Sequence, residues 1–197
     1  MEREQTGGVE VREGHLGGCY IGGDQGTYYP TMWRYILEKY SPKTVVDIGC
    51  GVGHSTLFFH EEGCNVLGVD GAEGAANNFL VPGKFRKVDY QDGPALSEFE
   101  EFDFCWSCEF VEHVYEEYAH NFMKDFSRAK YLAITHAQPN QGGYHHVNLK
   151  PSSYWIELAD QYGFDYDDAE TKHLQQLAAE PGKLKYFVQN GLFFVRR

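Results

Sequence analysis

The fold of this chain is decided by residues 44–53, which read Thr44-Val-Val-Asp47-Ile-Gly49-Cys50-Gly51-Val-Gly53. The segment begins as a β-branched run, which is typical of a strand covered on both faces. It then continues into an acid and three glycines spaced by two, and glycine lacks the Cβ that keeps a ligand away from the backbone. A helix that begins near Gly53 would point its free N–H groups into the same space. The segment therefore predicts a nucleotide-binding turn.

Strands and helices alternate along the rest of the chain. Strands are expected at 44–48, 65–69, 85–88, 102–107, 131–135, 164–166 and 191–195, and helices at 30–41, 54–62, 114–126, 152–162 and 169–179. This alternation predicts a doubly wound, mostly parallel α/β sheet of about seven strands. Ser152 is expected to cap the helix that follows it.

Three segments divide the chain by composition. Residues 1–29 are rich in glycine and are expected to form a flexible or lid-like arm. Residues 30–197 are expected to form the α/β domain. Within it, the polar segment 136–150 is longer than most connections in a compact domain, so we expect a functional loop that contacts the substrate.

Charge and composition exclude several classes of function. The net charge is −12 and the basic residues are scattered, which argues against a nucleic-acid partner. The sequence has no long apolar span and no signal-peptide core, so we expect a cytoplasmic protein without a membrane partner. The five cysteines fit reduced thiols, and Cys105-x-x-Cys108 is expected to pack in a strand instead of serving redox or zinc chemistry. The sequence carries no signal for an oligomeric state.

The spacing of the glycines separates two kinds of cofactor. A nicotinamide or flavin fingerprint requires Gly-x-Gly-x-x-Gly, which would need a glycine where the sequence has His54. Asp47 stands before the first glycine, where it would repel a phosphate and tolerate a cation. The turn is therefore predicted to bind a positively charged sulfonium ligand that carries an amino group.

With these residues the chain resembles the Rossmann-like (class I) S-adenosylmethionine-dependent methyltransferases over residues 30–197. The resemblance rests on segments in the right order. They are the glycine turn, Val-Leu-Gly-Val-Asp70-Gly71, Val88-Asp89 and Phe-Asp103-Phe-Cys-Trp106-Ser-Cys-Glu109-Phe-Val-Glu112-His113-Val. The resemblance implies an enzyme that transfers a methyl group from S-adenosylmethionine.

The resemblance also implies roles for individual residues. The glycines of the turn would let the backbone approach the cofactor, and Asp47 would help hold its amino end. Asp70 would accept hydrogen bonds from both ribose hydroxyls, and Asp89 would meet the adenine amino group. Trp106 could stack on the cofactor, although a strand tryptophan more often packs in the core. The alternative to cofactor binding by Asp70 and Asp89 is that both are ordinary turn residues at the ends of strands. The implied cofactor-binding set is Asp47, Gly49, Cys50, Gly51, Gly53, Asp70, Gly71, Asp89, Trp106 and Glu109.

The loop after the fifth strand carries the candidate catalytic residues. Methyl transfer to a hydroxyl requires removal of its proton, and histidine is suited to accept that proton near neutral pH. His145 and His146 are therefore the candidate catalytic residues, with hydrogen bonding inside the loop as the alternative. Glu109 and His113 would share one face if their segment is helical. The candidate substrate-binding residues are His113, Tyr144 and Asn148.

The acceptor is suggested by a looser resemblance. The run His145-His146-Val-Asn148, followed by Pro151-Ser-Ser-Tyr-Trp155, resembles a subgroup of methyltransferases associated with sugars or surface polysaccharides. A small hydroxylated acceptor is therefore the expected partner. A metal site of His136, His145 and His146 would lack a carboxylate at ligand spacing, so no metal is predicted.

Three alternatives remain beside this interpretation. The chain could be a cofactor-binding scaffold or regulatory protein without catalysis, or a methyltransferase with a protein acceptor. A nicotinamide-dependent oxidoreductase is disfavoured by His54. The motifs of DNA methyltransferases, an acid or amide followed by Pro-Pro-aromatic and a Pro-Cys pair, do not occur in the sequence.

Overall fold

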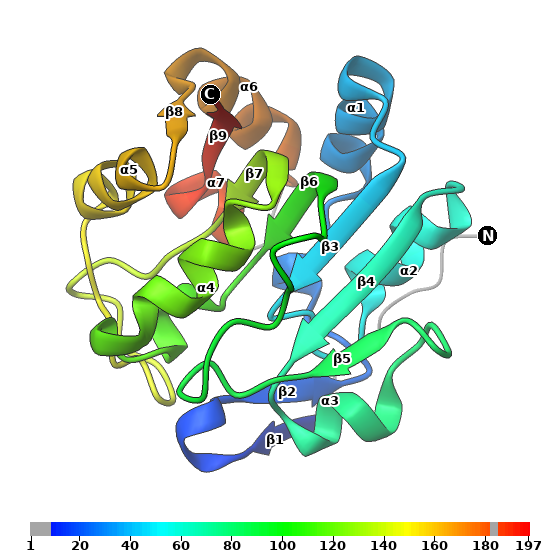
Figure 1. Ribbon diagram of the computed structural model, residues 1–197, viewed down its shortest axis with the longest axis vertical. Coiled ribbons are helices and arrows are strands. Elements are labelled where there is room, and N and C mark those ends of the chain that lie inside the picture. The colour runs from blue at the N-terminus through cyan, green and yellow to red at the C-terminus, as the bar shows by residue number, and fades with distance from the viewer. Residues whose placement is uncertain (1–8, 182–184) are drawn as a thin grey trace.

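A central sheet runs through the molecule in the computed structural model, which describes residues 9–181 and 185–197 (Figure 1). In these residues the sheet has seven strands in the order β5-β4-β3-β6-β7-β9-β8. They are β3 (Thr44–Ile48), β4 (Asn65–Asp70), β5 (Phe85–Lys87), β6 (Phe102–Ser107), β7 (Ala129–Ile134), β8 (Phe164–Tyr166) and β9 (Leu192–Arg196). The predicted α/β sheet is therefore confirmed.

The connections between the strands create a place for a ligand. β3 pairs in parallel with β4 on one side and with β6 on the other, while β9 runs antiparallel to both β7 and β8. The chain moves outward from β3 to β4 and β5 and then returns to β6 on the opposite side of β3. Such a reversal leaves a crevice at the carboxyl ends of the two central strands, where open α/β sheets bind ligands.

Helices cover both faces of the sheet. One face carries α1 (Pro30–Tyr40), α2 (His54–Glu61), α6 (Asp168–Ala178) and α7 (Tyr186–Asn190), which enclose a core that contains Trp33, Phe59 and Phe187. The other face carries α4 (Ala119–Phe126) and α5 (Ser152–Gln161), with Phe122 and Trp155 in its core. Burial of each such side chain contributes about 1.5–3 kcal/mol to folding.

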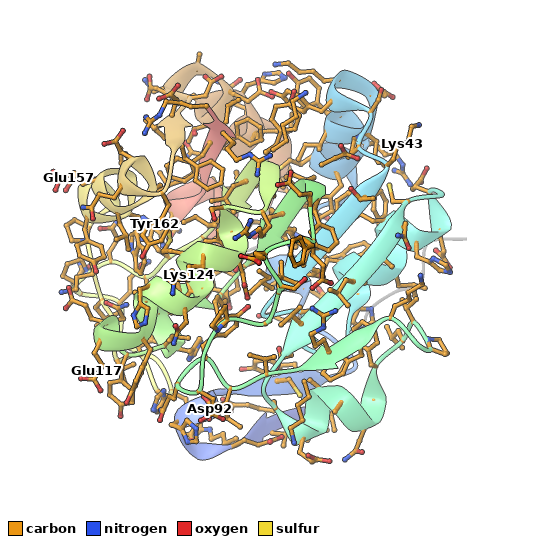
Figure 2. All side chains as sticks on the ribbon, in the orientation of Figure 1. Lys43, Asp92, Glu117, Lys124, Glu157 and Tyr162 are labelled. Atoms are coloured by element: carbon orange, nitrogen blue, oxygen red, sulfur yellow. The ribbon has the colours of Figure 1, made fainter. Side chains whose placement is uncertain are left out.

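Helix α4 shows how one helix divides between core and solvent. Phe122 and Phe126 are fully buried at i and i+4, whereas Lys124 lies on the outer side of the helix (Figure 2). Asp125 is buried as well, and its carboxylate accepts hydrogen bonds from Tyr90 Oη and from the backbone N–H groups of Ala95 and Leu96. These bonds fasten the segment after β5 to the helix.

The N-terminal segment differs from the expected flexible arm. Strands β1 (Val9–Arg12) and β2 (Gly18–Ile21) pair as an antiparallel hairpin, which lies beside the short helix α3 (Glu73–Asn78) in Figure 1. The Glu13 carboxylate accepts hydrogen bonds from the N–H groups of Glu73 and Gly74, each at 2.6 Å, and so joins the hairpin to α3. Residues 1–8 of the predicted arm lie outside the described residues.

Local details of the helices also differ from prediction. The helix expected over 114–126 is two short 3₁₀ turns, Val111–His113 and Glu116–Tyr118, followed by α4. The predicted cap at Ser152 is wrong, because Pro151 is the N-cap and Ser152 begins α5 with its hydroxyl 3.0 Å from His136 Nε2.

The Cys-x-x-Cys pair belongs to the core. Cys105 and Cys108 are buried among the side chains that cover opposite faces of the sheet. Each thiol is therefore packed by hydrophobic neighbours, and burial raises the pKa of both well above its ordinary value. This agrees with the predicted structural role.

Candidate functional site

A cavity of about 380 Å³ lies at the carboxyl ends of β3, β4 and β6. This volume falls in the range of small-molecule sites, ~300–1,000 Å³. The glycine turn, the N-terminal hairpin and the loop around His146 supply its walls. All of the predicted cofactor-binding residues line it: Asp47, Gly49, Cys50, Gly51, Gly53, Asp70, Gly71, Asp89, Trp106 and Glu109.

The three glycines of the turn are needed for different reasons. Gly49, Gly51 and Gly53 have φ values of 75°, 52° and 86°, in the left-handed region that favours glycine. A Cβ at Gly49 would lie 2.5 Å from Phe110, and one at Gly53 would lie 2.4 Å from Phe79. The protein's own aromatic side chains therefore fill the space at these two positions. Only at Gly51 does the turn leave room, since the nearest atom to a Cβ there is 3.8 Å away.

Asp47, near the end of β3, joins the glycine turn to the start of α2. Its side chain is buried, and one carboxylate oxygen accepts hydrogen bonds from the hydroxyls of Ser55 and Thr56 at 2.5 and 2.6 Å. Both hydroxyls belong to the first turn of α2. Burial raises the pKa of Asp47 to about 6 despite these bonds. The carboxylate thus fixes the start of α2 against the end of β3.

Asp70, at the end of β4, is fastened to the turn and faces the cavity. Its two oxygens accept hydrogen bonds from Gly51 N–H and Ala72 N–H, each at 2.8 Å. A carboxylate oxygen has two lone pairs, so each oxygen keeps one acceptor place. Burial raises the pKa of Asp70 to about 6, and the backbone donors oppose that rise.

Asp89 and Trp106 occupy different environments in the wall. Asp89 lies 2.6 Å from His15 Nε2 of the hairpin, and its other oxygen accepts the N–H of Gln91. Trp106 is 1 % exposed, and its ring packs on Phe187 and against Trp33. The indole is therefore packed in the core, as the stated alternative expected, and Trp106 also lines the cavity, so its stacking on the cofactor stays a prediction.

The hairpin adds residues that sequence analysis missed. Glu10, His15, Leu16 and Cys19 line the cavity opposite the glycine turn. A Cβ at Gly71 would lie 2.7 Å from Leu16, so the hairpin packs directly on the end of β4. The glycine content of residues 1–29 indicated a segment that could fold over a ligand, but its strand pairing had no signal in the sequence.

The loop end of the cavity gathers acids and histidines. Glu109, His113 and His146 line it, and the imidazoles of His113 and His146 meet edge to face with centroids 4.9 Å apart. The pKa of His113 is lowered to about 4 by burial, with further contributions from His146 and His145. Burial raises the pKa of Glu109, and that of Glu112 beneath it well above its ordinary value.

Glu109 and His113 do not lie on one helix, so the condition under which they were expected to share a face is not met. Glu109 has a φ of 53° and lies before the 3₁₀ turn Val111–His113. Its N–H donates to Thr135 Oγ1 at 2.8 Å, and the Thr135 hydroxyl lies 3.2 Å from the Glu109 carboxylate. The end of β7 therefore orients Glu109 toward the cavity.

The structure separates the predicted catalytic pair. His146 lines the cavity, whereas His145 lies outside its wall, with Nδ1 3.2 Å from the His113 carbonyl and its ring against Tyr115. Of the two candidate catalytic histidines, only His146 therefore lines the cavity, and the catalytic role of His145 stays a prediction. The φ of 52° at His145 turns the two neighbouring side chains in different directions.

The predicted substrate-binding residues also divide. Tyr144 lines the cavity and is 36 % exposed, with the Arg12 guanidinium 4.6 Å above its ring. Asn148 is 1 % exposed and is not among the residues that line the cavity, so its predicted contact with substrate stays a prediction. Its N–H and that of Val147 donate to the Glu112 carbonyl, which joins the loop to the 3₁₀ turn.

A cluster of potential metal ligands differs from the one considered in the sequence. His136 is fully buried beside Ser152, away from His146 in the cavity wall. Glu109, Glu112 and His146 instead each place a potential ligand atom within 4.8 Å of the others. The argument that no carboxylate stands at ligand spacing is therefore wrong, because the fold supplies two that the linear spacing did not reveal.

The charge of the cavity wall is one-sided. Among the described residues that form it there is no lysine or arginine. Its carboxylates are Glu10, Asp24, Asp47, Asp70, Asp89 and Glu109. Such a wall attracts a cationic ligand and repels a phosphate.

Comparison with known proteins identifies the class. Residues 46–130 match the protein family described as methyltransferase domain. Comparison with curated protein sequences gives no match. The chain therefore carries a methyltransferase domain, and that domain contains the glycine turn, Asp70, Asp89 and Glu109.

Solved structures give the same fold. A TehB-like SAM-dependent methyltransferase from Corynebacterium glutamicum is similar at 20 % identity, with 89 % of this chain and 90 % of that chain covered and a TM-score of 0.57. The magnesium protoporphyrin IX methyltransferase of Synechocystis PCC 6803 with bound SAM is similar at 18 % identity, 85 % and 76 % coverage and a TM-score of 0.57. The plantazolicin methyltransferase BpumL in complex with SAH is similar at 13 % identity, with 86 % of this chain and 83 % of that chain covered and a TM-score of 0.58.

Residues 46–130 match the methyltransferase domain family, and the chain has the fold of class I, Rossmann-like methyltransferases. It is an enzyme that uses S-adenosylmethionine. Within the described residues, no helix combines the length and apolar character needed to cross a membrane.

Proposed function

We propose that this enzyme transfers the methyl group of S-adenosylmethionine to a hydroxyl of a small acceptor, such as a sugar or a polysaccharide precursor. The observation that carries the proposal is the arrangement of one cavity. The glycine turn and Asp70 form one end of it, and Glu109 and His146 form the other. No lysine or arginine stands among the described residues that line it.

The cofactor fits the end of the cavity near β3 and β4. Gly51 leaves open space beside the backbone, and Asp70 keeps an acceptor place on each oxygen for the two ribose hydroxyls. Asp89 lies further along the wall, where its carboxylate can meet the adenine amino group. Bound there, S-adenosylmethionine supplies an electrophilic methyl carbon on a positively charged sulfur.

Acids in the wall favour that positive charge. Asp47 and Asp70 are ionised at neutral pH even though burial raises the pKa of each to about 6. Water competes poorly with them because both are buried, so their attraction for a cation is stronger than in bulk solvent. The same wall disfavours the pyrophosphate of a nicotinamide cofactor.

His146 is the side chain we assign to the acceptor hydroxyl. Its Nδ1 lies 3.0 Å from the Gln141 carbonyl, which can only accept, so the hydrogen is on Nδ1 and the lone pair on Nε2. A lone pair directed into the cavity can take the hydroxyl proton as the oxygen attacks. Tyr144 at the mouth would contact the rest of the acceptor.

The hairpin would keep solvent from the reacting atoms. It is held to α3 by Glu13 and to the segment after β5 by the contact of His15 with Asp89. Closing an active site in this way removes competing water. This is the lid role proposed for residues 9–29.

Methyl transfer from isotopically labelled S-adenosylmethionine tests the proposal directly. The purified enzyme is offered sugars and oligosaccharides, small peptides and single-stranded RNA. We expect label in the sugars, with kcat lowered about 100-fold or more in His146→Ala and little changed in His145→Ala. Label found only in peptide or RNA would overturn the acceptor class, and absence of cofactor binding by calorimetry would overturn the enzyme assignment as a whole.

A further inference from the structure

We propose that Glu109, Glu112 and His146 form a binding site for a divalent metal ion at the acceptor end of the cavity. The inference deepens the proposed function and rests on it for the role of the ion. Binding of the ion itself depends only on these three side chains.

The three ligands come from segments that are fastened to one another. Glu109 is held by Thr135 at the end of β7, and Glu112 lies in the 3₁₀ turn that follows. The Glu112 carbonyl accepts the N–H groups of Val147 and Asn148 at 2.9 and 3.1 Å, directly after His146. The ligand atoms, all within 4.8 Å of one another, are therefore positioned before any ion binds.

Glu112 supplies the independent indication of a ligand. Its side chain is 0 % exposed, and within the described part of the chain neither carboxylate oxygen has a hydrogen-bond partner. A buried carboxylate without a donor is strongly unfavourable unless it is paired or coordinates a metal. The neighbouring polar group is a second carboxyl, Glu109, so two acidic side chains that a divalent ion would bridge meet in one place.

The ligand set indicates the kind of ion. Two carboxylates and an imidazole supply oxygen and nitrogen and no thiolate, which suits Mn²⁺, Fe²⁺, Co²⁺ or Zn²⁺. The two negative charges balance the charge of one divalent ion, and His146 binds as the neutral imidazole. Glu109 and His146 line the cavity while Glu112 lies behind it, so remaining coordination positions face the acceptor.

An ion at this place would act on the acceptor hydroxyl. Coordination lowers the pKa of a bound hydroxyl, so its proton passes to solvent water more readily. The oxygen then forms its bond to the methyl carbon, and the carbon–sulfur bonding pair remains on sulfur. In the metal-bound enzyme His146 is a ligand, and the ion takes over the activation of the hydroxyl.

Mn²⁺ is the probe of choice because the buried thiols of this chain are poor ligands for it. Untagged full-length protein is freed of metal with a chelator and titrated with Mn²⁺, and the loss of the free-ion electron paramagnetic resonance signal is followed. We expect one ion per chain, with binding weakened at least ~10-fold in Glu112→Gln and in His146→Ala. Glu117→Gln, an exposed carboxylate on the outside of the molecule in Figure 2, is the matched control and should bind as the wild type does.

Circular dichroism and thermal unfolding establish that each variant is folded. Glu112→Gln replaces a buried acid with a neutral amide of the same shape, so the metal-free variant should unfold at about the same temperature as the wild type. The wild type should gain thermal stability with Mn²⁺, and this gain should be absent from the variant. Failure of the wild type to bind Mn²⁺, Co²⁺ or Zn²⁺, or equal binding by Glu112→Gln, would overturn the inference. Methyl transfer without metal binding would overturn the metal site and leave the proposed function intact. Metal binding without methyl transfer would support the metal site and overturn the proposed function.

Discussion

Asp70→Asn removes the charge of the residue that we assign to the ribose of the cofactor. In the wild type each oxygen of Asp70 accepts one backbone N–H at 2.8 Å, and one acceptor place per oxygen remains for the ligand. The amide keeps one acceptor oxygen and replaces the other with a donor. That donor would face either Gly51 N–H or Ala72 N–H, so the variant loses one ligand contact and weakens one bond within the turn.

The expected loss follows from the bonds removed. A hydrogen bond to a charged group contributes about 1.5–3 kcal/mol, so affinity for S-adenosylmethionine should fall by about 10- to 150-fold. The stability of the free protein should change less, because removal of a buried charge opposes the loss of one backbone acceptor. Asp92→Asn is the control, since Asp92, labelled in Figure 2, is an exposed acid that is not among the residues lining the cavity.

Isothermal titration with S-adenosylmethionine measures the affinity, and thermal unfolding without ligand checks the fold. A second signature is the pH dependence of the affinity. Burial raises the pKa of Asp70 to about 6, so wild-type affinity should decrease as the pH falls through that value. This dependence should be smaller in Asp70→Asn. An unchanged dissociation constant in a folded variant would remove Asp70 from the binding site.

Further variants test the loop, the core and the electrostatics. In Gly143→Ala the new Cβ would lie 2.3 Å from His146 Nε2, so we expect kcat/KM to fall about 100-fold. In the control Gly142→Ala the new Cβ meets open space, so kcat/KM should stay near the wild-type value. Equal kcat/KM values for the two variants would show that the position of the His146 imidazole is unimportant. Asp125→Ala leaves three donors, Tyr90 Oη and the N–H groups of Ala95 and Leu96, without their acceptor. It should lower the free energy of unfolding in urea by about 3–5 kcal/mol, and a loss below about 1 kcal/mol would contradict the bonding described. Because burial raises the pKa of Asp47 and Asp70 to about 6 from 3.8, the native state binds more protons than the unfolded state between these values. Stability of the ligand-free protein should therefore decrease as the pH rises from about 4 to about 6, by at most ~1.4 kcal/mol per pH unit for each group, and a shallower slope in Asp70→Asn would identify its share.

The glycine turn shows how much of the site could be predicted. Its position after β3 and its role in the cavity wall followed from a buried strand run, an acid and the glycine spacing. The reason for each glycine did not follow, because Phe110 and Phe79 approach Gly49 and Gly53 only in the folded chain. Local pattern therefore predicted the strand and the turn, and tertiary packing determined which glycine leaves space for a ligand.

The N-terminal hairpin and the Glu109–Glu112–His146 cluster could not be predicted for a related reason. The hairpin gains stability from Glu13 bonding to α3 and from Leu16 packing on Gly71, more than fifty residues away in the chain. His146 meets Glu112 because the loop returns across the end of β6, a path without periodic signal. Glu109 and Glu112 lie three residues apart in one segment, but His146 comes from a loop more than thirty residues later, and sequence spacing does not reveal that it meets them.

The acidic wall also predicts how the enzyme distinguishes its substrate from its product. S-adenosylmethionine carries a positive sulfur and S-adenosylhomocysteine does not, so the two differ in the charge that the cavity carboxylates attract. With Asp47 and Asp70 ionised near neutral pH, the wall should bind S-adenosylmethionine more tightly than a ligand with neutral sulfur, and so favour release after methyl transfer. As the pH falls through about 6 both carboxylates take up protons, and the ratio of the two dissociation constants should approach one. Calorimetric titration of both ligands at about pH 7.5 and at about pH 5.5 measures this ratio. A ratio that does not change with pH would show that the wall binds only the adenosine and amino-acid groups that the two ligands share, and that the charge on sulfur does not contribute to affinity.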